Sequence, residues 1–180
     1  MNQKNLLPEN CTLLFNSNTI QQKIKLMADQ LNTRYAGKPV VFLTIMNGGM
    51  IFATDLAKQL DLDMEMDYVQ VSRYGTETQG GQLIWKHQCE TSLKDKHVIL
   101  IDDIFDEGHT LLAVYEWCQE RGAKSVKSAV LVTKNHNRGY ADYQVDFFGI
   151  EVDDLYIFGY GMDYQEKLRH LNDIYYLQIQ

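Results

Sequence analysis

Long apolar runs are missing from this sequence. No stretch approaches the roughly 20 apolar residues that a helix needs to cross a bilayer. The segment 1–8 also has neither the apolar centre nor the cleavage-like site of a signal peptide. We therefore expect no membrane association and no secretion signal.

Cysteine is also scarce, and basic residues are fewer than acidic ones. The three cysteines, Cys11, Cys89 and Cys118, are odd in number and lack the spacing of a metal site, so we interpret them as free thiols in a reducing cytoplasm. The net charge is −7 and no basic run occurs. Because binding through phosphates needs concentrated positive charge, the sequence predicts no nucleic-acid partner.

The 180 residues suffice for one domain with its own core. Continuous apolar segments at 40–46 and 98–101 predict strands buried on both faces, as in a parallel sheet, and 126–133 is expected to be another buried strand. Helices are expected at about 18–35, 50–60 and 110–121, a turn and short helix at 162–169, and further strands at 67–72, 83–85, 146–152, 155–160 and 174–177. Ser17 or Asn18 is expected to cap the first helix. This alternation predicts an α/β fold with a mostly parallel sheet flanked by helices.

The segment 97–111 concentrates the polar chemistry. After the strand come four carboxylates, a glycine, a histidine and a hydroxyl, namely Asp102, Asp103, Asp106, Glu107, Gly108, His109 and Thr110. Ligands bind at the carboxyl ends of parallel strands, and a helix N-terminus there offers N–H groups to an anion. The carboxylates suit sugar hydroxyls, a metal or a proton. A simple helix cap at a solvated strand end would explain one or two of these acids, but four favour a site for a phosphorylated sugar with Mg²⁺.

This segment resembles the phosphoribosyl pyrophosphate motif of type I phosphoribosyltransferases, and it is most similar to the hypoxanthine-guanine branch. The family pattern is four apolar residues, two acids, two apolar residues, Asp, any residue, Gly, any residue and Thr, which residues 98–110 match. The resemblance implies transfer of 5-phosphoribose from phosphoribosyl pyrophosphate to hypoxanthine or guanine in purine salvage. It also implies Mg²⁺ as cofactor and a homodimer or homotetramer.

The resemblance assigns a role to each polar position of the motif. Asp106 would take or share the proton of the purine ring nitrogen. Asp102 and Asp103 would hold ribose hydroxyls and metal waters. The loop 107–110 would bind the 5-phosphate through backbone N–H groups and the Thr110 hydroxyl, with a histidine where the family frequently has lysine.

Two glycine-containing loops resemble other parts of the family site. Asn47 and Gly48 follow the strand at 40–46 and match the pyrophosphate loop, although the family usually has lysine at position 47. We predict a cis or otherwise strained Met46–Asn47 peptide there, with N–H groups facing the pyrophosphate. The segment 73–81 resembles the flexible loop, whose tyrosine is matched by Tyr74, and we expect residues 74–81 to be poorly ordered without ligand.

The C-terminal third resembles the part of the family site that binds the base. Lys134 matches the lysine that hydrogen-bonds the six-oxo group, and Tyr156 matches the aromatic residue stacked on the purine. Ile157 matches the residue whose backbone carbonyl contacts the base. Asp163 matches an aspartate near the base and the second Mg²⁺, and Arg169 matches an arginine that reaches pyrophosphate. Taken singly, Lys134 would more often be a solvated surface charge and Tyr156 a core aromatic, and the side chain of Ile157 could serve packing alone. For Asp163 and Arg169 a surface salt bridge is the less favoured alternative.

The resemblance implies a single domain over residues 1–180. Its core would span about 17–160, and a hood over the base pocket would combine about 1–16 with 160–180. Two alternatives stay open: a phosphoribosyltransferase for another base, such as xanthine or a pyrimidine, and a non-enzymatic RNA-binding regulator on the same fold. A phospho-acceptor signalling domain fits poorly, because its acidic pair should follow the first strand.

Overall fold

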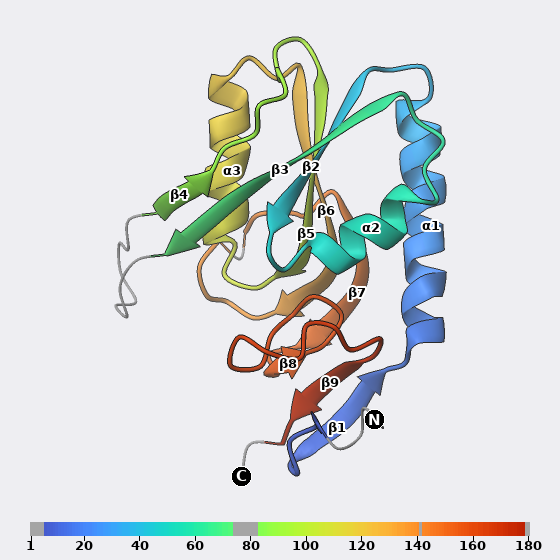
Figure 1. Cartoon of the computed structure of the whole chain (residues 1–180), viewed down its shortest axis with the longest axis vertical. Helices are drawn as coiled ribbons and strands as arrows, with labels where there is room; N and C mark the ends of the chain where they lie inside the picture. Colours follow the sequence, from blue (N-terminus) through green and yellow to red (C-terminus); the bar gives the residue numbers. More distant parts are fainter. Residues whose placement is uncertain (1–5, 74–82, 141, 179–180) are drawn as a thin grey trace.

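The computed structural model describes residues 6–73, 83–140 and 142–178 (Figure 1). The larger sheet has six strands in the order β4-β3-β2-β5-β6-β7. Their bounds are β2 Val40–Met46, β3 Met64–Arg73, β4 Leu83–His87, β5 His97–Phe105, β6 Ser125–Asn135 and β7 Phe147–Asp153. Within this sheet, over the described residues, only the β3–β4 pair is antiparallel. The predicted α/β fold with a mostly parallel sheet is confirmed.

Helices cover both faces of this sheet. On one face lie α1 (Ser17–Tyr35) and α2 (Met50–Ala57), and on the other lies α3 (His109–Glu120) (Figure 1). Side chains of the central strands alternate between the two cores. Phe42 and Ile99 belong to the core under α1 and α2, whereas Leu43 and Leu100 belong to the core under α3. The central strands are therefore apolar at successive positions because each side is buried.

The first helix is capped by a residue that the sequence analysis did not choose. The side chain of Asn16 accepts a hydrogen bond from the Thr19 N–H at 3.0 Å, so the predicted caps Ser17 and Asn18 are wrong. The Ser17 N–H instead donates to the Asp173 carboxylate at 2.7 Å. This contact joins the start of α1 to the segment just before Ile174, since the two residues are 156 positions apart in the sequence.

Three short strands form a second, antiparallel sheet in the order β1-β9-β8. They are β1 (Cys11–Phe15), β8 (Ile157–Phe158) and β9 (Ile174–Leu177). In Figure 1 this sheet lies below the carboxyl ends of the central parallel strands. The carboxyl ends of the central parallel strands therefore face a second layer instead of open solvent.

The segment between β8 and β9 folds differently from the prediction. A short helix was expected within 162–169, but the chain makes successive turns there and the helix prediction is wrong. Gln165, Glu166 and Leu168 have φ values of 51°, 63° and 64°. These are left-handed conformations, which a right-handed helix cannot include. The predicted strand at 155–160 is also reduced to Ile157–Phe158.

Several strand ends lie further along the chain than predicted. β5 continues to Phe105 and β6 to Asn135, whereas the apolar patterns ended at 101 and 133. Parallel pairing continues past the apolar residues, with Asp102 beside Val130 and Phe105 beside Thr133. The acidic pair and Lys134 are therefore held by regular strands and not by a loop. This rigid backbone places their side chains at one edge of the sheet.

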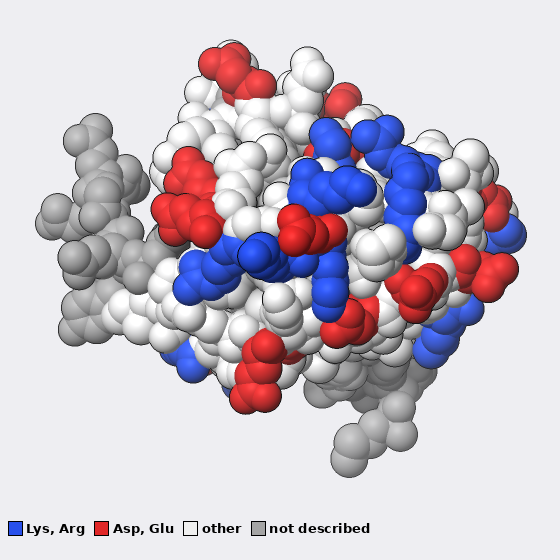
Figure 2. All heavy atoms as spheres, turned by 90° about the horizontal axis from the view of Figure 1, so that it is seen from above, with Lys and Arg blue, Asp and Glu red and all other residues white. Residues whose placement is uncertain are grey.

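The opposite end of the molecule carries mixed charge. Figure 2 shows Lys and Arg side chains gathered with Asp and Glu on the face where the parallel strands begin. Burial and the charges of Lys124, Lys38 and Arg34 lower the pKa of His97 at the start of β5. Two further lysines of this end are paired, Lys96 with Glu65 and Lys127 with Asp146.

The absence of a nucleic-acid partner stays a prediction. None of the helices in the described part of the chain is long and apolar enough to cross a membrane.

Candidate active site

A cavity of about 510 Å³ lies between the carboxyl ends of the parallel strands and the smaller sheet. It is lined by the turn after β2, the end of β5 with the start of α3, the end of β6, and the segment after β7. Every site residue predicted from the sequence lines this cavity except Tyr74, which lies outside the described residues. Segments far apart in the sequence thus meet around one space.

The turn before α3 forms one wall of the cavity. Gly108 has a φ of 79°, and a Cβ there would lie 2.6 Å from the Phe105 ring, so both conformation and space require glycine. No side chain of the described residues caps this helix. The N–H groups of its first turn, together with the Thr110 hydroxyl, are therefore available to an anion at the cavity. His109 lies 3.5 Å from the Glu107 carboxylate.

The turn after β2 forms the facing wall. The Met46–Asn47 peptide bond is cis, as predicted. The Gly49 N–H donates to the Ile45 carbonyl at 3.0 Å, so the expectation that the N–H groups of this loop face the ligand is wrong for Gly49. The Asn47 side chain accepts a hydrogen bond from Gln70 at 3.4 Å.

Gly48 in this turn packs directly against the acidic pair. A Cβ at Gly48 would lie 2.6 Å from Cγ of Asp103, closer than any real contact. A larger residue here would therefore have to displace the Asp103 carboxylate. It follows that the turn and the carboxylate form one packed unit.

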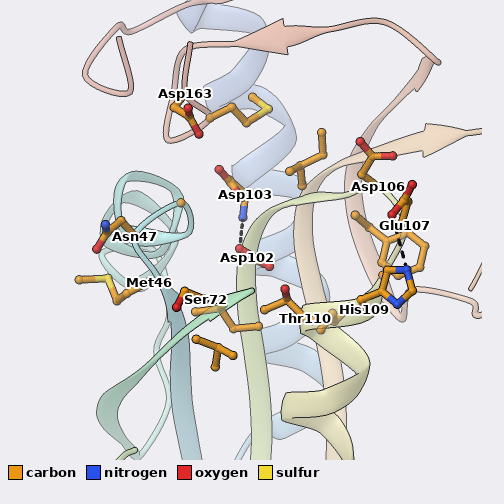
Figure 3. A pocket seen from close by; sticks show the side chains of 18 of the residues that line it. Met46, Asn47, Ser72, Asp102, Asp103, Asp106, Glu107, His109, Thr110 and Asp163 are labelled. Atoms are coloured by element: carbon orange, nitrogen blue, oxygen red, sulfur yellow. Dashed lines mark hydrogen bonds and ion pairs between the residues drawn. The ribbon is translucent and has the colours of Figure 1, made fainter. Parts of the chain in front are cut away.

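Asp102 and Asp103 lie between the two turns (Figure 3). The Asp103 side chain is buried, and its N–H donates to the Asp102 carboxylate at 3.0 Å. Burial and the charge of Asp103 raise the pKa of Asp102 well above its usual range, and burial raises the pKa of Asp103. Arg169 opposes both shifts. A site of this kind favours a cation or hydroxyl groups as ligands.

Asp106, just beyond β5, is surrounded by donors. Its Oδ2 accepts from Lys134 Nζ at 2.7 Å, and its Oδ1 accepts from His136 Nε2 at 2.6 Å. Arg138 adds a longer contact of 3.4 Å to Oδ1. Burial acts to raise the pKa of Asp106, but the hydrogen bonds from Lys134 and His136 outweigh it and the pKa is lowered. Asp106 is therefore a carboxylate at neutral pH.

Ligand atoms of Asp106, His136 and Asp154 lie within 4.8 Å of one another, which resembles a metal site. The Arg138 guanidinium already occupies this group, because it donates twice to Asp154, once at 2.9 Å. We interpret the cluster as an ion-pair network. The predicted metal residues Asp102, Asp103 and Asp163 form no such close group within the described residues.

The remaining wall comes from the segment after β7. The Tyr156 ring is half exposed at the cavity, whereas Ile157 is buried in β8. Asp163 accepts hydrogen bonds from Arg169 at 2.7 Å and from the Glu166 N–H at 2.8 Å. Arg169 also donates to the Gly161 carbonyl at 2.7 Å. These bonds explain why the segment folds into turns instead of the predicted helix.

Comparison with known proteins identifies the family. The family profile described as "Phosphoribosyl transferase domain" matches residues 12–167. The chain belongs to the phosphoribosyltransferase family. This family membership agrees with the resemblance seen in the sequence. It also agrees with the geometry, in which two turns face each other across an acidic pair.

Named phosphoribosyltransferases match nearly the whole chain. The hypoxanthine-guanine phosphoribosyltransferase of Bacillus subtilis (strain 168) is 35% identical over 160 residues, 88% of each chain. The hypoxanthine-guanine-xanthine phosphoribosyltransferase of Tritrichomonas foetus is 33% identical over 159 residues, 88% of this chain and 87% of the relative. A crystal structure of a hypoxanthine phosphoribosyltransferase from Staphylococcus aureus has a TM-score of 0.87 at 34% identity and covers 93% of this chain and 91% of that one.

Three residues around Asp106 were not selected from the sequence. They are His136, Arg138 and Asp154, which surround its outer side. A signal was present, because Lys134, His136 and Arg138 alternate at the end of a strand. Alternate strand residues share a face, so the pattern places basic groups on the side of Lys134.

Replacing Asp102 with asparagine should stabilise the phosphoribosyltransferase in the absence of metal. The folded state raises the pKa of Asp102, so wild-type stability falls as pH rises from the ordinary pKa of aspartate to the raised one. Asparagine does not titrate. We expect a gain of about 1 kcal/mol at pH 7, shrinking as the pH is lowered to about 4.

Urea unfolding with chelator at both pH values measures this gain, and Asp142→Asn at an exposed position is the control. A less stable Asp102→Asn protein at pH 7 would show that the pair is not under electrostatic strain.

Proposed function

We propose that this protein transfers 5-phosphoribose from phosphoribosyl pyrophosphate to hypoxanthine or guanine, giving IMP or GMP and pyrophosphate. The observation that carries the proposal is the contact of 2.7 Å between Lys134 and Asp106 beside the anion-binding turn. In a 6-oxopurine, O6 and N7 are neighbours on one edge of the base. An ammonium suits O6, and a carboxylate suits the proton on N7. The adjacent Lys134 and Asp106 side chains therefore complement both atoms.

The two turns suit the two ends of the sugar substrate. The loop 107–110 would bind the 5-phosphate through N–H groups of α3 and the Thr110 hydroxyl. Asn47 and Gly48 would contact the pyrophosphate from the other side, with Arg169 supplying positive charge. Asp102 and Asp103 lie between these positions, where the ribose hydroxyls would lie. Support comes from the shared cavity and from the names of the relatives.

Mg²⁺ fits the donors at this site. Asp102, Asp103 and Asp163 offer carboxylate oxygens, which Mg²⁺ prefers, and the burial of the acidic pair favours a neutralising cation. Mg²⁺ commonly binds through one or two carboxylates, waters and substrate phosphates, so a close cage of three carboxylates is not required. When bound, it would neutralise charge on the pyrophosphate leaving group.

The protein groups would act on the base during transfer. As the N9 lone pair forms the bond to C1′ of ribose, the bond from C1′ to the pyrophosphate oxygen breaks. The proton on N7 then passes to, or is shared with, the ionised Asp106. Lys134 would hold O6 and thereby orient the ring. Tyr156 offers a partly exposed ring face for stacking, and the backbone carbonyl of Ile157 would contact the base edge.

Several wider features belong to the same proposal. We assign β1, β8 and β9 with their connections as the hood over the base. Cys11, Cys89 and Cys118 are free thiols, which supports a reducing cytoplasmic location. Exposed apolar side chains on β3 and β4, including Met66 and Ile84, support assembly as a homodimer or homotetramer.

The test of the function is product formation from phosphoribosyl pyrophosphate with each purine in turn. Hypoxanthine and guanine should give IMP and GMP with Mg²⁺, and activity should vanish in excess chelator and return with added Mg²⁺. Adenine should be used poorly, because its amino group would meet the Lys134 donors. A kcat/KM for adenine comparable to that for hypoxanthine would contradict the assignment, as would full activity in chelator.

Asp106→Asn should fold normally and bind phosphoribosyl pyrophosphate, yet lose about 10²–10⁴-fold in kcat because a general base is removed. Steady-state kinetics and calorimetric binding of the sugar measure the two effects separately. Asp142→Asn, at an exposed position, is the control. Turnover near that of the wild type would remove Asp106 from the mechanism.

Gly48→Val should greatly weaken binding of phosphoribosyl pyrophosphate, because the new side chain collides with Asp103 and displaces the turn. Asn47→Ala should cost little if the loop binds through its backbone. Titration calorimetry compares the two dissociation constants. The reverse order would mean that the Asn47 side chain, and not the loop backbone, makes the contact.

A further inference from the structure

His136 lies directly behind Asp106, at the first position after β6. Its side chain is only 7% exposed, and it is not among the described residues that line the cavity. Both ring nitrogens are engaged. Nε2 lies 2.6 Å from Asp106 Oδ1, and Nδ1 lies 3.1 Å from the backbone N of Arg138. A buried imidazole with two partners is held in one orientation.

The hydrogen bond from Arg138 determines which nitrogen carries the proton. A backbone N–H can only donate, so Nδ1 of His136 must accept and is unprotonated. In the neutral ring the proton is then on Nε2, which donates to Asp106 Oδ1. The backbone of the 136–138 turn thus sets the histidine tautomer. The histidine in turn supplies a directed donor to the carboxylate.

We propose that His136 is a positioning residue that orients and keeps ionised the carboxylate of Asp106 for proton acceptance from the purine. This rests on the function proposed above. Lys134 also donates to Asp106, but it lines the cavity and would share its N–H groups with the base. His136 lies outside the cavity, so its bond persists while the base binds and leaves. The hydrogen bond from His136 therefore fixes the orientation of the Asp106 carboxylate before the substrate binds.

Other charged groups surround the same carboxylate from each neighbouring element. Lys134 comes from β6, Glu107 from the turn after β5, and Asp154 from the turn after β7. Arg138 contacts Asp106 as well as Glu107 and Asp154. Its side chain is about half exposed, however, and its main partner is Asp154. Solvent and salt weaken such an exposed contact. The buried donor of His136 is less screened, so it has the stronger influence on Asp106.

Two substitutions separate the donor from the volume of the side chain. Glutamine places an N–H group near the position of Nε2, whereas leucine fills the space without a donor. We expect His136→Leu to lower kcat about 10-fold, the scale of one hydrogen bond to a charged group, with the KM for phosphoribosyl pyrophosphate within about twofold of the wild type. The acidic limb of the kcat/KM profile should move to higher pH. His136→Gln should retain most of kcat and the wild-type limb.

The neighbouring Asn137 is the matched control, because it is exposed and belongs to the same turn. Asn137→Ala should leave kcat and the pH profile unchanged. Equal losses in the leucine and glutamine variants would overturn the proposal, and so would a leucine variant with wild-type kinetics. A loss that appears only in KM would also overturn it, because positioning of the base should affect kcat.

A measurement without turnover keeps this proposal distinct from the proposed function. Carboxyl ¹³C NMR of the folded protein follows Asp106, whose signal is assigned by its loss in Asp106→Asn. Its titration should move to higher pH in His136→Leu and stay in place in His136→Gln. Imidazole ¹⁵N NMR should show the proton of His136 on Nε2. A proton on Nδ1, or an unchanged Asp106 titration, would overturn the proposal even if IMP is formed. Failure of the wild type to form IMP would instead contradict the function alone.

Discussion

The close contact between Gly48 and Asp103 is the constraint on which the site depends. β2 and β5 are adjacent parallel strands, so the turns that follow them emerge at the same edge of the sheet. Any side chain at position 48 would collide with the Asp103 carboxylate. Glycine at position 48 therefore lets the turn after β2 rest on the acidic pair without displacing the Asp103 carboxylate. This packing brings the turn after β2 to the same cavity as the turn at the start of α3.

Charge in the site is arranged in two different ways. Burial raises the pKa values of both Asp102 and Asp103, and the charge of Asp103 raises the pKa of Asp102 further, so the folded chain holds acidic groups that favour an incoming cation or hydroxyl groups. At Asp106, donors from Lys134 and His136 lower the pKa despite burial. The two regions are only a few residues apart in sequence. The end of β5 therefore carries two kinds of acidic group: a buried pair whose pKa values are raised, and a carboxylate whose pKa is lowered by its donors.

The local parts of this design were predictable from the sequence. The strand followed by acids, glycine and threonine depends on neighbours in the chain, and the cis peptide at Met46–Asn47 was inferred from resemblance. What the sequence pattern missed depends on particular side-chain contacts, some local and some distant. The helix cap is Asn16, whose side chain accepts from the Thr19 N–H, and the Ser17 N–H donates to Asp173. The turns at 162–169 are held by Arg169 and not by local propensity. The contact of His136 with Asp106, on which its proposed role rests, needed the structure, because it requires β6 beside β5.

The central claim is that two turns on neighbouring strands form the two halves of one substrate site. Amide NMR of ¹⁵N-labelled protein tests it most directly, with ribose 5-phosphate and Mg-pyrophosphate added separately. The account predicts that ribose 5-phosphate shifts the amides of residues 107–110 and that pyrophosphate shifts those of Asn47 and Gly48. Phosphoribosyl pyrophosphate should shift both groups along one binding curve. Shifts of Asn47 and Gly48 with ribose 5-phosphate, while residues 107–110 stay unchanged, would contradict it.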